Sequence, residues 1–436
     1  MSIRLNSVFG FLGFAIPAIV MLFAYPILMR SLGLSGFGIY ILATSTSGAL
    51  AFLDFGFSSA TVKFIAEDLA RGRIQDAGEV LGTSLLFYGA LGAVCASALW
   101  ILSPWLTLMF HVGISLRPQA LWAFRLAAIQ FAVFLLTAVF LALFKGMQRF
   151  HWSTASLSLL SLLTYGGAVL AVRHGLVGVT ATSLGANILV LLFSATTGLR
   201  ILRPRKPRWS VFRRMFAFGS MMTVNSVSGL LLYQVQRYLI AIGMGPAAVA
   251  IYQTASVAPA KVHAAVTAFT EVLFPVASAS PERVGLRGVY LKMMAASALI
   301  IVLTFAPLLA LKEKLFSMWL GPHVAAEALP ILTPFILAYI FLAMSPAPFH
   351  LLNGLGKPGI NTAFFAMNAM VNVLCVGIFN MRGASLLHFA WAFALANIVT
   401  GCAYQLFVEF SVWRGAPDPV RLPPSLPPCH PHASAS

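Results

Sequence analysis

Charged residues are scarce in this chain, and acidic residues are the scarcest. Only 9% of the 436 residues are charged, and Asp and Glu together number 11. Soluble domains carry roughly 25% charged residues. The composition is 60% hydrophobic with a mean hydropathy of +0.90, which a soluble fold has no interior to hold. This excludes a soluble protein and predicts one that lies in a bilayer, where each helical span takes about 20 apolar residues.

Large polar segments and nucleotide-binding loops are also lacking. A membrane enzyme such as a polysaccharide polymerase or a glycosyltransferase needs a sizeable polar loop or soluble domain with paired acids. The connections between the apolar runs are too short and too poor in acids for that. No Gly-rich loop ending in Gly-Lys-Ser/Thr is present, so the chain does not bind ATP by that motif. We therefore expect no enzyme and no cofactor.

Cysteine is nearly absent, and its spacing is uninformative. Cys95, Cys375 and Cys402 lie in apolar runs and Cys429 lies near the end, which excludes a disulfide framework. The stretch Cys429-His430-Pro431-His432 offers metal-ligating side chains. It belongs to a tail with seven prolines in its last 22 residues, a composition typical of disorder. We expect no metal site.

Apolar runs make up most of the chain. They do not alternate polar and apolar residues, which excludes transmembrane strands and predicts helices. Twelve helical spans are expected, at residues 8–29, 37–62, 80–103, 119–143, 153–172, 175–199, 215–242, 247–276, 291–311, 328–352, 361–380 and 385–410. The chain is thus predicted to be an all-α polytopic membrane protein.

Basic residues lie between these runs and set the orientation. The formal charge of +17 is spread over the connections, so no basic domain exists to bind nucleic acid. With the N-terminus in the cytoplasm, nineteen Lys and Arg fall on the cytoplasmic side and six on the other. Both termini are therefore predicted to be cytoplasmic. The densest basic segment, residues 200–214, reads as a cytoplasmic linker that also attracts anionic membrane lipids.

An internal repeat divides the chain into two halves. "LGLSGFGIYILAT" (32–44) aligns with "MGPAAVAIYQTAS" (244–256), and "LFKGMQR" (143–149) aligns with "LLNGLGK" (351–357). The offsets are near half the chain, which indicates two parallel six-helix lobes with a path between them. We predict an N-lobe at 1–205, a C-lobe at 206–415 and a disordered tail at 416–436.

Three stretches carry a family resemblance. "LGLSGFGIYILATSTSGALAFLDFGFSSATVKFIAE" (32–67) resembles the opening of polysaccharide exporters of the oligosaccharide-flippase type, with its Gly-x-Tyr and Leu-Asp-x-Gly elements. "ALFKGMQRF" (142–150) resembles the end of their fourth span, and "GMGPAAVAIYQTAS" (243–256) the start of their second half. The family often has an acidic residue near Gln236-Arg237, and this chain has none.

The resemblance implies a V-shaped carrier of the multidrug/oligosaccharidyl-lipid/polysaccharide superfamily in a bacterial inner membrane. Members of the O-antigen type move undecaprenyl-diphosphate-linked oligosaccharide to the periplasmic leaflet for surface polysaccharide synthesis. Polysaccharide polymerase and chain-length proteins are the expected partners. Energy then comes from an ion gradient or from consumption of the flipped lipid. Two alternatives stay open: a multidrug-and-toxin-extrusion (MATE) drug/cation antiporter, and a lipid II flippase.

Three basic residues fall inside predicted spans, where a charge costs about 2.5–3.5 kcal/mol. Arg125, Arg237 and Lys261 are candidates for an electropositive cavity that binds a diphosphate. The alternative for the two arginines is that their long side chains reach the membrane interface. Lys261 lies too deep for that, which favours a cavity or an ion pair.

Acidic and amide side chains supply the remaining candidates. Asp54 and Glu271 are candidate gating or ion-coupling carboxylates. Asp54 also reads as a helix cap at a local break. Glu271 also reads as a partner of Lys261 or as a residue whose side chain reaches the membrane interface. His263 is a candidate proton relay, or else a packing residue. Asn368 and Asn372 share a helical face and suit sugar hydroxyls as well as hydrogen bonds between helices.

Overall fold

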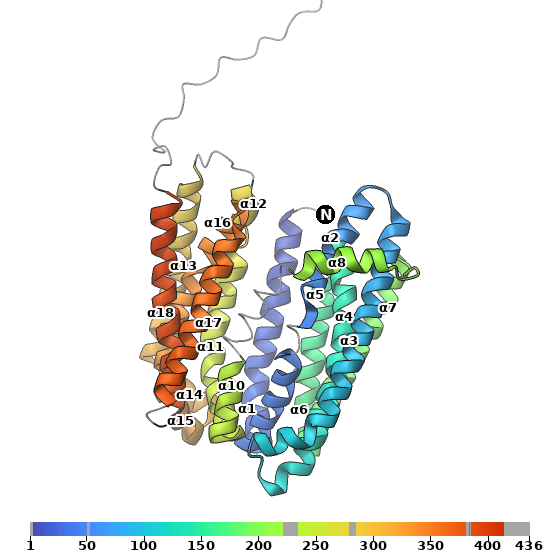
Figure 1. Ribbon diagram of the computed structural model, residues 1–436. Helices are drawn as coiled ribbons and strands as arrows, with labels where there is room; N and C mark the ends of the chain where they lie inside the picture. The colour runs from blue at the N-terminus through green and yellow to red at the C-terminus, as the bar shows by residue number, and fades with distance from the viewer. Residues whose placement is uncertain are drawn as a thin grey trace, which may run out of the picture.

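The computed structural model describes residues 3–49, 53–220, 234–278, 285–380, 383 and 385–413, and within them the regular structure is helical (Figure 1). The helices of the first half are α1 (Ile3–Ala49), α2 (Phe57–Ala70), α3 (Ile74–Met109), α4 (Arg117–Gly146), α5 (Phe150–Ser161), α6 (Gly167–Ala171), α7 (Gly175–Ile201) and α8 (Trp209–Ser220). Those of the second half are α10 (Val235–Met244), α11 (Pro246–Thr270), α12 (Leu273–Ser278), α13 (Leu286–Ala310), α14 (Lys312–Leu320), α15 (Pro322–Met344), α16 (Pro346–Gly354), α17 (Pro358–Asn380) and α18 (Leu386–Ser411).

Eight stretches of the described chain are long and apolar enough to cross a bilayer. Some of them contain a reversal of the chain. In α1, Gly33 is not helical (φ 70°, ψ 167°), and the rings of Tyr25 and Phe37 lie 5.1 Å apart. Twelve residues of straight helix would separate them by about 18 Å, so α1 consists of two antiparallel helices. An all-α polytopic membrane protein is confirmed, and the number of twelve spans stays a prediction.

Several predicted spans are broken in the structure. The predicted span 37–62 divides at residues 53–56, where Phe55 and Gly56 have positive φ and α2 begins at Phe57. The span 247–276 divides at Glu271, and the span 328–352 divides at Ser345. Hydropathy is continuous across these breaks, which is why the apolar pattern alone did not locate the latter two.

The two halves repeat the same backbone features. Gly33 and Gly245 align in sequence and share one conformation, with φ 70° and ψ 167° in the first and φ 80° and ψ 179° in the second. Gly146 and Gly354 both end a helix in close contact with an earlier one. A Cβ at these positions would lie 3.0 Å and 2.6 Å from a backbone oxygen of α2 and α12. The repeat read from the sequence is therefore present in the backbone.

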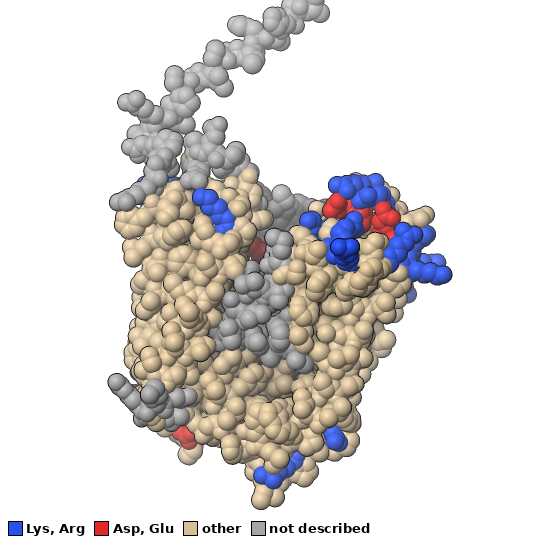
Figure 2. Space-filling model, in the orientation of Figure 1, with Lys and Arg blue, Asp and Glu red and all other residues tan. Residues whose placement is uncertain are grey.

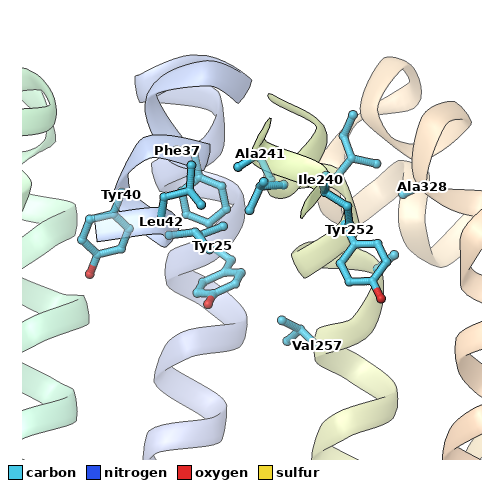
Figure 3. Packing of buried hydrophobic residues seen from close by; sticks show 14 of the residues in the cluster. Tyr25, Phe37, Tyr40, Leu42, Ile240, Ala241, Tyr252, Val257 and Ala328 are labelled. Carbon is cyan, nitrogen blue, oxygen red and sulfur yellow. The ribbon is translucent and has the colours of Figure 1, made fainter. Parts of the chain in front are cut away.

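The halves share one hydrophobic core and have separate cores elsewhere. The shared core contains Phe37 and Leu42 of α1 together with Ile240, Ala241 and Tyr252 of α10 and α11, in one layer (Figure 3). A second core belongs to the first half alone, and a third to the second half alone. The halves thus join at one end and diverge at the other (Figures 1 and 2).

Hydrogen bonds reinforce the joined end, which we call the closed end. Trp319 Nε1 donates to the Leu22 carbonyl at 2.9 Å, and Arg30 donates to the Trp319 carbonyl at 3.3 Å. Gly38 packs directly on the start of α11, where a Cβ would lie 1.8 Å from the Pro246 carbonyl oxygen. Only glycine permits this approach between the halves.

The opposite end, which we call the basic end, carries the dense basic segment of residues 200–214. Asp68 is buried and binds Arg73 at 2.5 Å and Arg214 at 3.5 Å, and Glu79 binds Arg208 at 3.2 Å. Figure 2 shows Lys, Arg, Asp and Glu side chains gathered over α2, α3 and α8. These ion pairs join α2 to α8, and α3 to the segment that leads into α8, at this end of the first half.

The boundary between the two lobes, placed at residues 205 and 206, stays a prediction. Helix α8 follows residue 205 and yet packs against α2 and α3 of the first half. Among the described residues, Gly219 of α8 contacts the Phe55–Gly56 backbone closely. The predicted disordered tail at 416–436, with Cys429 to His432, lies outside the described residues.

Candidate functional site

A cavity of about 570 Å³ lies between the two halves. Helices α1, α4, α5 and α7 supply one wall, and α10 and α11 supply the other. The volume falls within the roughly 300–1,000 Å³ of small-ligand sites. Its polar lining residues include Tyr25, Tyr40, Gln130, Tyr165, Asn187 and Gln253.

Arg237 is the charged residue among those that line this cavity. It comes from the first turn of α10, and its Nη1 donates to Ser45 Oγ at 3.2 Å and to Gln234 Oε1 at 3.1 Å. Both acceptors are neutral, so its charge has no carboxylate partner in the ion pairs of the described chain. A guanidinium held by two neutral oxygens in this position is available to a bound anion.

Lys261 does not line the central cavity. It lies on α11 eight residues beyond Gln253, which is roughly 12 Å nearer the basic end. Eight residues are about 2.2 helical turns, so the Lys261 side chain is rotated by roughly 80° from that of Gln253 about the helix axis. The side chain is half-buried. Along α11, Lys261 therefore lies between Gln253 and the basic end.

Arg125 lies outside the cavity, which corrects its prediction as a lining residue. Its guanidinium stacks on the rings of Trp100 and Trp122, at 5.0 Å and 5.5 Å from their centroids. Both tryptophans are exposed on the outer surface of the first half. Tryptophan and arginine together in this position are typical of a membrane interface. The alternative reading, a side chain that reaches the membrane interface, stays a prediction.

A second, smaller cavity of about 150 Å³ lies within the second half. His263 of α11 and Asn368 of α17 line it, with further polar residues of α17 and α18. Asn368 donates to Asn397 Oδ1 at 3.2 Å and to Thr400 Oγ1 at 2.5 Å. These bonds join α17 to α18, so Asn368 holds helices together and is remote from the central cavity.

Asn372 also lies away from the central cavity, in correction of its prediction as a cavity residue. It is fully buried and its Oδ1 accepts from Gln236 Nε2 at 2.8 Å. Tyr252 in turn donates its hydroxyl to Gln236 Oε1. This chain of hydrogen bonds ties α17 to α10 and α11, the helices that position Arg237. Asn372 therefore helps to hold α10, which carries Arg237, in position without lining the cavity.

Asp54 caps the helix that follows it. Its Oδ1 accepts the backbone N–H of Ser58 at 3.3 Å and the hydroxyl of the buried Tyr88 of α3. The first N–H groups of a helix lack partners within it, so a carboxylate here stabilises the start of α2. The second bond fixes this turn against α3. The capping interpretation of Asp54 is the one that these contacts support.

Glu271 is not a partner of Lys261. It is exposed at the end of α11, ten residues beyond Lys261. Ten helical residues span about 15 Å, which excludes a direct ion pair between the two. His263 and Glu271 also lie apart from the central cavity, so a gating role for either stays a prediction.

The tyrosines of the cavity were missed from the sequence. Tyr25, Tyr40 and Tyr165 belong to apolar runs, where aromatic residues usually face lipid or the interface, and no sequence pattern separates these three from the other aromatic residues. Tyr25 and Tyr40 are buried, and Tyr40 pairs with Ser183 of α7 at 3.4 Å. Figure 3 shows Tyr25 and Tyr40 on α1, and the break at Gly33 places them on its two antiparallel helices. The repeat motif does single out Tyr40, because its equivalent is Tyr252.

Known proteins share both sequence and fold with this chain. The model of a family described as polysaccharide biosynthesis proteins matches residues 6–280. A Shigella flexneri protein named "Putative O-antigen transporter" is 24% identical over 93% of this chain and 97% of its own length.

Solved structures show the same architecture. An inward-facing multidrug resistance MATE family transporter of the MOP superfamily superposes with a TM-score of 0.76 at 14% identity, over 93% of this chain and 98% of its own. The lipid II flippase MurJ, in an inward closed conformation, gives 0.74 at 14% identity, over 93% and 87%. The fold is therefore of the MATE type, as the sequence predicted. Because the family model covers well over half of its residues, the chain belongs to the polysaccharide biosynthesis protein family.

Proposed function

We propose that this protein moves a lipid-linked oligosaccharide from the cytoplasmic to the periplasmic leaflet of the inner membrane, by alternating access. The observation that carries the proposal is the central cavity between the halves, with Arg237 as its charged residue. The family and the name of the Shigella flexneri relative support an O-antigen type of cargo. The diphosphate of an undecaprenyl carrier is an anion that suits Arg237, whose guanidinium bonds only neutral oxygens in the described part of the chain.

The chemistry of Arg237 favours an anionic head group. A diphosphate offers several oxygens to the planar guanidinium, and charge-assisted hydrogen bonds are roughly twice as strong as neutral ones. The bonds that Arg237 now makes, to Ser45 and Gln234, are to neutral oxygens. An anion would therefore displace them. Lys261, which lies between Gln253 and the basic end along α11, would attract the same head group.

The arrangement of cores supports alternating access. The halves are joined by one core at the closed end and have separate cores toward the basic end. Since each half keeps its own core, the halves can rock without unfolding. The opposite state would break the bonds of Trp319 with Leu22 and of Tyr238 with the Ser45 carbonyl, the latter at 3.2 Å. The closed end thus faces the periplasm and the basic end the cytoplasm in this proposal.

The test is a deletion strain complemented with the full chain. Undecaprenyl-linked oligosaccharide is measured on the cytoplasmic face of inverted vesicles, together with surface polysaccharide. We expect the deletion to retain the lipid-linked glycan inside and to lose surface polysaccharide, with both restored by complementation. Unchanged glycan lipids with raised dye sensitivity would instead indicate a drug antiporter. Retained lipid II with a normal glycan lipid pool would indicate a lipid II flippase.

A further inference from the structure

The first-half wall of the central cavity contains a π-helical turn. Residues Leu162–Gly166 form this turn between α5 and α6. Single π turns are rare and frequently lie at functional sites, because they shift side chains out of the regular helical register. Thr164 and Tyr165 of the turn, and Ser161 just before it, all line the cavity. The departure from regular helix thus coincides with the cavity wall.

Two hydroxyl groups at this turn lack hydrogen-bond partners. Ser161 Oγ and Thr164 Oγ1 are buried and make no hydrogen bond to the described residues. Many other hydroxyls of the same half bond to their own helix, as Thr180 does to the Leu176 carbonyl at 2.9 Å. Ser158 Oγ, one turn before Ser161 on α5, is also without a partner in the described chain, but Ser158 does not line the cavity. An unsatisfied buried polar group costs about 1–3 kcal/mol. A ligand that brings hydroxyl groups would satisfy both.

The same wall carries no formal charge. Its polar groups are tyrosine, serine, threonine, asparagine and glutamine side chains, and the ring centroids of Tyr25 and Tyr165 lie 6.2 Å apart. On the opposite wall, Gln253 Oε1 is also without a partner in the described chain. The cavity is therefore asymmetric, with a cation on the α10 side and neutral hydrogen-bonding and aromatic groups on the π-turn side.

We propose that the wall formed by Ser161, Thr164 and Tyr165 is a subsite for a neutral sugar. It takes the sugar next to the diphosphate, while Arg237 holds the diphosphate itself. This proposal rests on the proposed function and adds a selectivity to it. A sugar offers several hydroxyls to Ser161, Thr164 and Gln253, and an apolar ring face to the tyrosines. A uronic acid at the same position would bring a carboxylate to a wall without a cation, and it would add no affinity to that of the diphosphate.

The size of the cavity limits the subsite to the linkage region of the substrate. A volume of about 570 Å³ is that of a small-ligand site, so a diphosphate and the sugar next to it are the parts that the cavity selects. The distal sugars then contribute little to selection. The inference predicts tolerance of varied glycans that begin with the same neutral sugar.

The experiment measures binding of three probes to the purified full chain in nanodiscs. The probes are undecaprenyl diphosphate, the same lipid carrying one N-acetylglucosamine, and the same lipid carrying one glucuronic acid. For the wild type we expect the neutral sugar to improve affinity about tenfold over the bare diphosphate, and the acidic sugar to give no gain. Thr164→Val should reduce the tenfold preference to about twofold and leave the bare diphosphate affinity unchanged.

Controls separate this proposal from the proposed function. Thr180→Val removes a hydroxyl that already bonds its own helix, and it should keep the preference. Arg237→Gln should weaken all three probes alike. If the wild type binds the three probes equally, the sugar subsite is wrong while the diphosphate site stands. If it binds none of them, the proposed function fails and the subsite with it. Should Thr164→Val not fold, Ser161→Ala and the comparison of neutral with acidic sugar still decide the proposal.

Discussion

Charged residues in predicted spans of this protein differ in their surroundings. Arg125 and Arg237 both lie in predicted spans, and yet Arg125 stacks on exposed tryptophans while Arg237 lines the cavity between the halves. The difference matters because removing a charged side chain from water costs free energy. A charge inside the protein needs a partner or a ligand, whereas a charge at the interface reaches water and lipid head groups.

We predict that Arg237→Gln reduces surface polysaccharide more than tenfold, because the cavity loses its charge and its planar hydrogen-bonding group. Arg237→Lys should retain partial function, since the charge remains but the fork does not. The measurement is surface polysaccharide in the complemented deletion strain, normalised to protein in the membrane. Arg125→Gln is the matched control and should stay within about twofold of wild type. Normal export by Arg237→Gln would contradict the proposed site.

Asp54 gives a prediction about stability. Asp54→Asn keeps an oxygen that accepts the Ser58 N–H, so both stability and export should be retained. Asp54→Ala removes the cap and should cost about 0.5–2 kcal/mol. Thermal unfolding of the detergent-purified chain measures the difference between the two variants. Lost export from a well-folded Asp54→Asn protein would show instead that the negative charge is required.

Helices in this fold are defined as much by their breaks as by their hydropathy. Gly33 reverses α1, Gly245 separates α10 from α11, and the turn at Leu162–Gly166 distorts the path from α5 to α6. Each break lies beside a contact between the halves or beside the cavity. Breaks of this kind place side chains where a continuous helix could not.

Packing between α1 and α11 gives a prediction for the closed end. Gly38→Ala places a Cβ against the Pro246 carbonyl and should separate the halves there, since overpacking of this kind costs about 1–3 kcal/mol. The rate of thiol labelling at Thr44→Cys reports the separation. The Thr44 hydroxyl bonds only carbonyls of its own helix in the described chain, so its loss breaks no contact between helices. We expect a periplasmic, membrane-impermeant thiol reagent to label Thr44→Cys faster when Gly38→Ala is present.

The control for this measurement is Gly185→Ala. Gly185 lies on α7 with no neighbouring atom within 4 Å of a built Cβ. It should leave the labelling rate unchanged. Equal labelling with Gly38→Ala and with native Gly38 would mean that this contact does not hold the closed end together.

The whole molecule combines two similar halves around one shared core. The halves resemble each other in backbone and differ in chemistry. The position equivalent to Asp54 in the repeat is the buried, apolar Val266, and the cavity's arginine comes from the second half alone. This asymmetry gives the cavity one charged wall and one neutral wall. The two walls therefore suit a substrate with a charged part and a neutral part.

Orientation in the membrane is the prediction at this scale. The four cysteines are first replaced, and Lys206→Cys or Gly113→Cys is introduced singly. Both positions are exposed, the first at the basic end and the second in the α3–α4 connection. A membrane-impermeant maleimide added to intact spheroplasts should label Gly113→Cys, and it should label Lys206→Cys only after the membrane is opened. The reverse pattern would place the basic end outside the cytoplasm and overturn the transport direction.

Composition and pattern determined much of this protein without a structure. Scarce charge and long apolar runs fixed an all-α membrane protein, because no other environment accommodates such surface. The two aligned segments predicted the repeat that Gly33 and Gly245 confirm in their backbone angles. The family likeness predicted the MATE-type fold. All of these properties are local along the chain or are summed over it.

Tertiary structure alone decided which polar residues meet. Arg237, Tyr25, Tyr165 and Gln253 line one cavity because four separated helices turn particular faces toward it. Asn368 and Asn372 share a face of α17, and yet they bond to different helices and neither reaches the central cavity. In an apolar span the hydropathy signal does not distinguish a face toward lipid from one toward a cavity. That distinction depends on how distant segments pack, so no pattern within one segment contains it.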